Sequence, residues 1–106
     1  MTKYLVEGNY VGEGMKGLLK DGGTGRRAAI EKLLQSLGGK IEAIYFSFGE
    51  HDLYLIADLP DNVSGEAAYL TVMASGALTL KTTVLLSPEE VDQAAKKTPM
   101  YRAPGQ

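Results

Sequence analysis

The segment from Tyr45 to Leu59 contains the single histidine of the chain, His51, with an aspartate directly after it. A histidine acts as a general base when a carboxylate orients its ring, so His51 and Asp52 are candidate catalytic residues. Neighbouring residues of a turn rarely point at each other, and this pair would need support from another strand or subunit. The alternative, which we favour, is that Gly49 and Asp52 serve turn geometry and that His51 is solvated.

A second set of candidates lies on predicted strands. Glu7 and Asp58 are carboxylates, and Tyr54 adds a hydroxyl that suits ligand binding. A carboxylate in a half-enclosed site can act as a general base, so Glu7 is a third catalytic candidate. The alternative is an interface network in which these acids pair with Lys3 or Lys81.

The segment "KDGGTGRR", from Lys20 to Arg27, raises the question of phosphate binding. Glycine amides and helix N-termini bind anions, but the segment lacks the Gly-Lys-Ser/Thr ending of a nucleotide loop and follows no strand. We interpret it as a break in a helix, with Thr24 as the N-cap. Positive charge at a helix start opposes the macrodipole, so we expect a carboxylate or a small anion beside Arg26 and Arg27.

These residues must be positioned by a small set of elements. Alternating and helical apolar patterns predict strands at 3–10, 40–48, 53–59 and 77–86, and helices at 13–20, 26–37, from Asn62 or Ser64 to Ser75, and from Pro88 onward. The order β-α-β-β-α-β-α is the ferredoxin-like βαββαβ pattern with an extra C-terminal helix, an α+β fold. We expect an antiparallel four-stranded sheet of order 4-1-3-2, in a single domain of residues 1–97 followed by an extended tail, 98–106.

Local signals fix several helix ends. Gly38 and Gly39 follow the second helical segment and suit a left-handed cap. In "SPEEVDQAAKK", Ser87 is a predicted N-cap, Pro88 the first helical residue and Glu90 the third, which is the pattern of a capping box.

The hairpin of the second and third strands decides which side chains face the helices. If Phe48 pairs with Leu53 across the tip, one side of the sheet is apolar and lies beneath the helices. The other side carries Ala43, Tyr45, Ser47, Tyr54, Ile56 and Asp58, with Leu5, Glu7 and Asn9 from the first strand and Lys81 from the fourth. Its tyrosines and isoleucine would form an exposed apolar patch on a monomer, so we expect a second copy or a ligand to cover it. The candidate ligand-binding residues are Tyr45, Tyr54, Asp58 and Asn9 there, and Arg26 and Arg27 elsewhere.

Composition narrows the classes of partner. The chain of 106 residues has a net charge of −2, which argues against nucleic acid. It has no apolar run that would span a bilayer and no signal-peptide layout at its start, so we expect a cytoplasmic location and no membrane partner. The absence of cysteine removes disulfides and thiolate nucleophiles. One histidine and scattered carboxylates predict no metal site, and we expect no cofactor.

Two stretches of sequence resemble the GYD-domain family of small bacterial proteins. They are "GLLKDGGTGRRAAIEKLLQSLGGKIEAIYFSFGEHDLYLIADLPD", from Gly17 to Asp61, and "ASGALTLKTTVLLSPEEVD", from Ala74 to Asp92. The resemblance implies a ferredoxin-like fold related to the dimeric α/β-barrel proteins. The Gly-Tyr-Asp cluster that names the family falls on Gly49, His51 and Asp52, with histidine in place of tyrosine.

Two functions remain open at this point. The first is a small homodimer or higher homo-oligomer that binds a small organic or anionic ligand, or a partner, through the open sheet face. The second is a cofactor-independent enzyme of monooxygenase or isomerase type, acting on a small organic molecule in the barrel cavity, since the barrel relatives include such enzymes. No nucleophile motif is visible, which favours the first.

Overall fold

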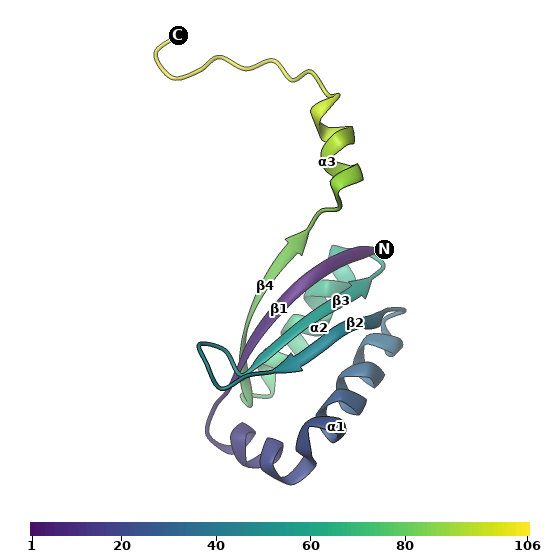
Figure 1. Cartoon of the computed structure of the whole chain (residues 1–106), viewed down its shortest axis with the longest axis vertical. Coiled ribbons are helices and arrows are strands. Elements are labelled where there is room, and N and C mark those ends of the chain that lie inside the picture. The colour runs from purple at the N-terminus through teal and green to yellow at the C-terminus, as the bar shows by residue number, and fades with distance from the viewer.

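A computed structural model describes residues 1–106 and contains one four-stranded antiparallel sheet and three helices. The elements are β1 (Thr2–Tyr10), α1 (Glu13–Ser36), β2 (Lys40–Phe46), β3 (Leu53–Leu59), α2 (Asn62–Ala74), β4 (Leu78–Leu85) and α3 (Pro88–Ala95). The sheet order is β2-β3-β1-β4 (Figure 1). This confirms the ferredoxin-like α+β fold with an added helix.

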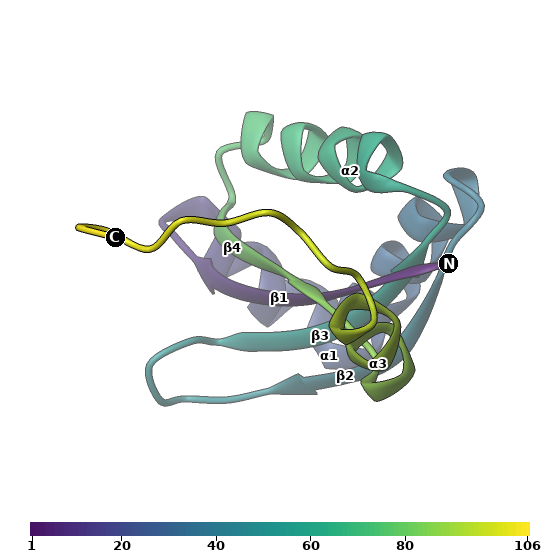
Figure 2. The same cartoon turned by 90° about the horizontal axis from the view of Figure 1, so that it is seen from above.

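The core lies between one face of the sheet and the helices α1 and α2 (Figure 2). Alternate residues of β3, including Leu53 and Leu55, point toward the helices and are buried, as are Tyr4 of β1 and Ile30 and Leu34 of α1. The other face of the sheet is not covered by any helix of the chain. The period of two along the strands therefore separates an apolar helix face from an open face, as the sequence predicted.

The predicted pairing of Phe48 with Leu53 is wrong. Phe46 pairs with Leu53, and β2 ends there. The hairpin closes because the Ser47 amide donates to the Asp52 carbonyl at 2.8 Å, which leaves Phe48 in the tip and fully exposed. From Ala43 to Phe46 the shift is two residues, which keeps those side chains on their predicted faces. Before Ala43 an irregularity changes the shift by one more residue, so Ile41 packs against the core on the helix side.

Helix α1 is interrupted inside the glycine-rich segment, as predicted. Gly22 has φ 72° and ψ 172°, and it is the residue of α1 with non-helical dihedrals. Thr24 is therefore helical and is not an N-cap, which corrects that expectation, since an N-cap has non-helical dihedrals. Gly38, at φ 81°, follows the helix end, as the glycine pair indicated.

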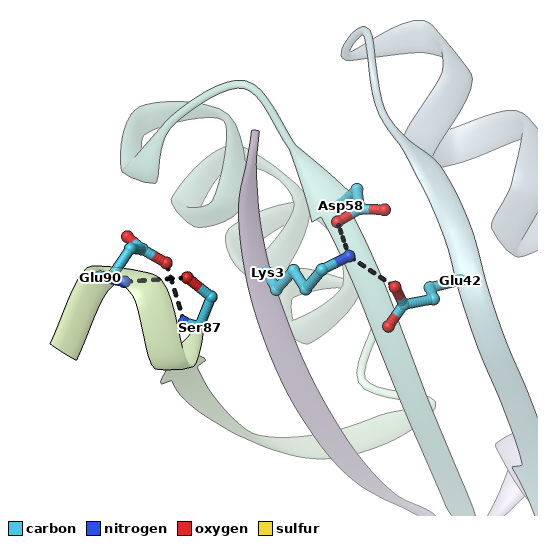
Figure 3. A network of polar contacts seen from close by, with 5 residues as sticks. All are labelled: Lys3, Glu42, Asp58, Ser87 and Glu90. Carbon is cyan, nitrogen blue, oxygen red and sulfur yellow. Dashed lines mark hydrogen bonds and ion pairs between the residues drawn. The ribbon is translucent and has the colours of Figure 1, made fainter. Parts of the chain in front are cut away.

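The caps of the other helices follow local chemistry. The N-cap of α2 is Asp61, whose carboxylate accepts from the Ser64 amide at 2.9 Å, so the expected caps Asn62 and Ser64 were wrong by a few residues. The capping box of α3 is confirmed. The Ser87 hydroxyl accepts from the Glu90 amide, and the Glu90 carboxylate accepts from the Ser87 amide (Figure 3).

Helix α3 and the residues after it extend away from the sheet (Figure 1). Every residue from Pro88 to Gln106 is exposed, and no helix or strand follows α3. The radius of gyration is 17.0 Å, whereas a compact domain of this length has about 13 Å. This C-terminal arm, residues 88–106, therefore adds length without adding to the core.

Candidate functional site

The histidine at the hairpin tip folds back over the open face of the sheet. His51 Nε2 lies 3.4 Å from Glu7 Oε2, and His51 Nδ1 lies 3.2 Å from Asn9 Nδ2. Its ring also meets the Tyr54 ring edge-on, with centroids 5.8 Å apart. We call Glu7, Asn9, His51 and Tyr54 the tip cluster. Its residues come from two segments far apart in sequence, β1 and the hairpin tip with β3, and sheet pairing brings these together.

The register of the sheet explains why the tip cluster forms. Glu7 and Asn9 are two residues apart on β1 and share a face, and Glu7 is paired directly with Tyr54 of β3. The His51 and Glu7 side chains are only 16% and 17% exposed. A histidine and a carboxylate are thus held together in a mostly enclosed position at one end of the open face.

The contacts of His51 determine what its ring can do. When the Asn9 amide nitrogen donates to Nδ1, Nδ1 is an acceptor and the proton of a neutral ring sits on Nε2, facing the Glu7 carboxylate. Both ring nitrogens then have partners. A substrate would have to displace the Asn9 amide before His51 could take a proton from it, whereas Glu7 is oriented by His51 as it stands.

Asp52 does not orient His51, so the less favoured interpretation of the tip, a catalytic His51–Asp52 pair, is not what the structure shows. The Asp52 carboxylate accepts instead from the backbone amide of Tyr10, at 3.0 Å. The Asp52 amide in turn donates to the Gly8 carbonyl and the Asn9 side-chain oxygen. Side chains of adjacent residues in an extended segment diverge, so Asp52 faces β1 and fixes the tip, the structural role that the sequence favoured.

Gly49, expected to serve turn geometry, does so without a conformation that requires glycine. Its φ is not positive, and an added Cβ would meet only the Ser47 hydroxyl oxygen, at 3.4 Å. Its amide donates to that same oxygen at 3.0 Å. The tip is therefore shaped by Ser47 and Asp52 rather than by the freedom of a glycine.

A second polar cluster lies at the other end of the open face. Lys3 donates to Asp58 at 2.8 Å and to Glu42 (Figure 3). These bonds, first that to Asp58 and then that to Glu42, raise the pKa of Lys3. Asp58 is buried and bonded to Lys3. A ligand would have to displace Lys3 to reach it. The contact is the pairing with Lys3 that the sequence offered as the alternative to a ligand role. Glu42 was not predicted as a site residue, because the irregularity of β2 between Ile41 and Ala43 is not visible in its sequence.

An apolar strip separates the two polar clusters. Tyr45 is paired with Tyr54 and is 72% exposed, and Ile56 and Leu5 are paired on the neighbouring strands. Of the predicted ligand residues on the open face, Tyr45 and Tyr54 are neighbours. Asn9 belongs to the tip cluster, and Asp58 lies at the opposite end of the face. Glu7 forms no ion pair with Lys81, although the two are register partners.

The two arginines belong to a different part of the molecule. Arg26 Nε donates to the Tyr10 hydroxyl at 3.4 Å, and its NH1 lies 4.0 Å from Asp21. Arg27 pairs with Glu31 at 3.8 Å along the helix. Both therefore have the carboxylate neighbours that the helix break predicted, but they lie on the helix side of the sheet and do not join the tip cluster.

The profile of the GYD domain matches residues 4–95. The chain belongs to the GYD domain family. No curated protein and no solved structure matches it. In this GYD domain protein, the tip cluster, the Lys3 network and the apolar strip between them all lie within the matched residues.

Two further properties of this GYD domain protein bear on its chemistry. Its Asp, Glu and His side chains form no group of three that would hold a metal ion. None of its helices combines the length and the apolar character needed to cross a membrane. The open face carries one histidine, carboxylates, an amide, tyrosine hydroxyls and the amines of Lys3 and Lys81.

Proposed function

We propose that this GYD domain protein is a small homo-oligomer that binds a small organic molecule at the open sheet face. The observation that carries the proposal is the tip cluster, in which a mostly enclosed histidine and glutamate adjoin a partly exposed apolar strip. Polar groups that converge beside apolar surface are typical of small-molecule sites.

Self-association would cover the apolar side chains on the open face of the sheet, which no helix of the chain covers. A sheet with one solvated face normally alternates apolar and polar residues, yet here Leu5, Ile56 and Tyr45 lie on the side without helices. A second sheet packed face to face, at about 10 Å, would bury this strip and form a two-layer core. The tip cluster would then lie at the edge of the interface, where a ligand can still enter.

The chemistry of the tip cluster selects the class of ligand. Glu7 accepts hydrogen bonds, and the hydroxyls of Tyr45 and Tyr54 both donate and accept. Aromatic rings supply the apolar contact. A phenol or another small hydroxylated aromatic molecule matches this set better than a polyanion, which the Glu7 carboxylate would repel.

Light scattering after size-exclusion chromatography tests the association. The wild-type mass at micromolar concentration should exceed one chain, and Ile56→Lys should give a monomer because it places a charge in the interface. Val63→Lys, on the exposed surface of α2, is the matched control and should leave the mass unchanged. A wild-type protein that runs as a clean monomer contradicts the oligomer.

Thermal-shift screening against phenols, small carboxylic acids and phosphates tests the ligand site. A ligand that binds the native state raises the melting temperature. Binding of a phenol should be weakened by both His51→Gln and Glu7→Gln, and not by Arg27→Gln on the far side of the sheet. If no phenol shifts the melting temperature at millimolar concentration, the proposed ligand class is wrong.

The contact between His51 and Glu7 also supports a second candidate function, a cofactor-independent enzyme of isomerase or monooxygenase type. A histidine that orients a carboxylate can serve proton abstraction from a small organic molecule. Exchange of substrate protons for deuterium in D2O, followed by NMR, would reveal this step. This exchange should be lost in Glu7→Gln. If no ligand that binds the wild-type protein exchanges its protons, the enzyme function is ruled out and only ligand binding remains.

A further inference from the structure

A second candidate site lies on the opposite side of the sheet, between the two helices that cover it. A half-open cavity of about 100 Å³ is lined mainly by apolar side chains of β3, α1 and α2, including Leu55, Ile30, Leu34, Ala68 and Val72. Residues of both α1 and α2 line the cavity, together with residues of the sheet. Protein interiors normally leave few voids larger than a water molecule, so an apolar space of this size requires an explanation.

A single cation lies at the end of this cavity. Arg26 of α1 lines it, and its side chain is only 25% exposed. A guanidinium has five N–H donors, but Arg26 makes one hydrogen bond, at 3.4 Å to Tyr10, and one ion-pair contact, at 4.0 Å to Asp21. Both contacts are long for charge-assisted bonds, which run at about 2.7–2.9 Å. Arg26 is therefore a largely enclosed cation with donors to spare.

The cavity continues into a wider polar cleft. Arg26, Val72 and Leu78 line both spaces, so the two are adjacent and Arg26 stands at their junction. The cleft has a volume of about 460 Å³ and includes Glu13 and Asp21. These two carboxylates would repel a phosphate or a dicarboxylate. A ligand with a single negative charge, placed next to Arg26, is attracted by the arginine and is repelled less by the two carboxylates.

We propose that the cavity binds a small monocarboxylic acid, with its apolar end between the helices and its carboxylate on Arg26. An apolar cavity of about 150 Å³ accommodates benzene, and the cavity here has about 100 Å³ and is half open. A short alkyl chain can therefore lie within it, and a phenyl group can enter it from the open side. The ligand enters from the polar cleft. The site is separated by the sheet from the proposed site at the tip cluster, so either proposal can fail without the other.

Titration of the wild-type protein with hexanoate and phenylacetate, by calorimetry or thermal shift, tests the site. Both acids should bind saturably and more tightly than the matched alcohols, hexanol and 2-phenylethanol, which lack the charge. Arg26→Gln should weaken binding of the acids by about tenfold or more, the scale of one charge-assisted hydrogen bond. It should leave binding of the alcohols nearly unchanged.

Two matched pairs of variants separate the site from general effects. Arg27→Gln removes a neighbouring arginine that pairs with Glu31 outside the cavity, and it should not alter binding. Ala68→Leu fills the cavity and should abolish binding of acids and alcohols alike, whereas Ala67→Leu, next to it on α2 but outside the lining, should not.

Three results would overturn the proposal. They are no binding of either acid to the folded wild-type protein at millimolar concentration, equal effects of Arg26→Gln and Arg27→Gln, and unaltered binding in Ala68→Leu. Circular dichroism and urea unfolding of each variant confirm that the protein tested is folded. Loss of acid binding in His51→Gln but not in Arg26→Gln would place the bound acid at the tip cluster instead.

Discussion

At the scale of single residues, the hairpin tip divides two roles between neighbours. Asp52 accepts from the Tyr10 amide and ties the tip to β1, whereas His51 reaches over the open face to Glu7 and Asn9. Asp52 therefore serves the fold, whereas His51 belongs to the proposed ligand site. The two roles are separable by substitution.

Asp52→Ala should lower the free energy of unfolding by about 1–2 kcal/mol, because the Tyr10 amide loses its acceptor. His51→Ala should cost less than about 1 kcal/mol, since water can reach the partners it leaves. Urea denaturation of both variants measures the difference. A His51→Ala protein that fails to fold would show that His51 belongs to the core and would remove it as a site residue.

The N-cap of α2, Asp61, predicts how the stability of the protein depends on pH. Hydrogen bonds from the Ser64 amide and hydroxyl hold the pKa of Asp61 below its ordinary value of 3.8. A lowered folded-state pKa stabilises the protein above the unfolded value, and the stabilisation disappears as the pH falls through the folded value. Wild-type protein should therefore be more stable than Asp61→Asn near neutral pH, and the difference should shrink below about pH 4. Thermal unfolding across pH measures this, and a difference that grows in acid would contradict it.

At the scale of elements, the kink in α1 depends on one glycine. Gly22 has φ 72° and ψ 172°, a region that residues with a Cβ rarely adopt. The kink lies just before Arg26 in the chain, so it determines how the second half of α1 carries that arginine to the cavity. The glycine-rich segment thus has a geometric function, as the sequence indicated, without the features of a nucleotide loop.

Gly22→Ala should lower the free energy of unfolding by about 1–3 kcal/mol, because alanine is strained at this φ and ψ. Gly17→Ala is the control within the same helix. Gly17 is helical, and a Cβ there would meet nothing within 4 Å, so the change should stabilise by about 0.5–1 kcal/mol. Chemical denaturation compares the two. Equal effects would mean that the helix is continuous through Gly22.

At the scale of the whole molecule, the chain consists of a folded sheet domain and a C-terminal arm. The arm, residues 88–106, is exposed throughout and does not pack on the sheet. The capping box involves only residues at the start of α3, so the first turn of α3 is stabilised without contacts to the domain. The arm adds nothing to the core.

Ending the chain after Ser87 should therefore leave the melting temperature nearly unchanged. If the open sheet face is the interface, the truncated protein should also keep the mass of the full chain in light scattering. A truncated protein that becomes monomeric would instead assign the association to the arm. That outcome would redirect the proposal from the sheet face to α3 and the residues after it.

The sequence by itself determined which segments are helices and strands, and which strand residues face the helices. Those features depend on neighbours in the chain, namely the alternation along β3, the glycines after α1 and the Ser87–Glu90 capping box. A register error of two residues left this assignment intact from Ala43 to Phe46, because the side-chain period of a strand is also two, but the irregularity before Ala43 was not predicted.

Only the tertiary structure decided the partners of the site residues. His51 faces Glu7 rather than Asp52, because the contact depends on the pairing of β1 with β3 across more than forty residues of sequence. The cavity beside Arg26 likewise depends on how two helices rest on one sheet. Such contacts are set by the packing of segments distant in the chain, which no local pattern of residues records.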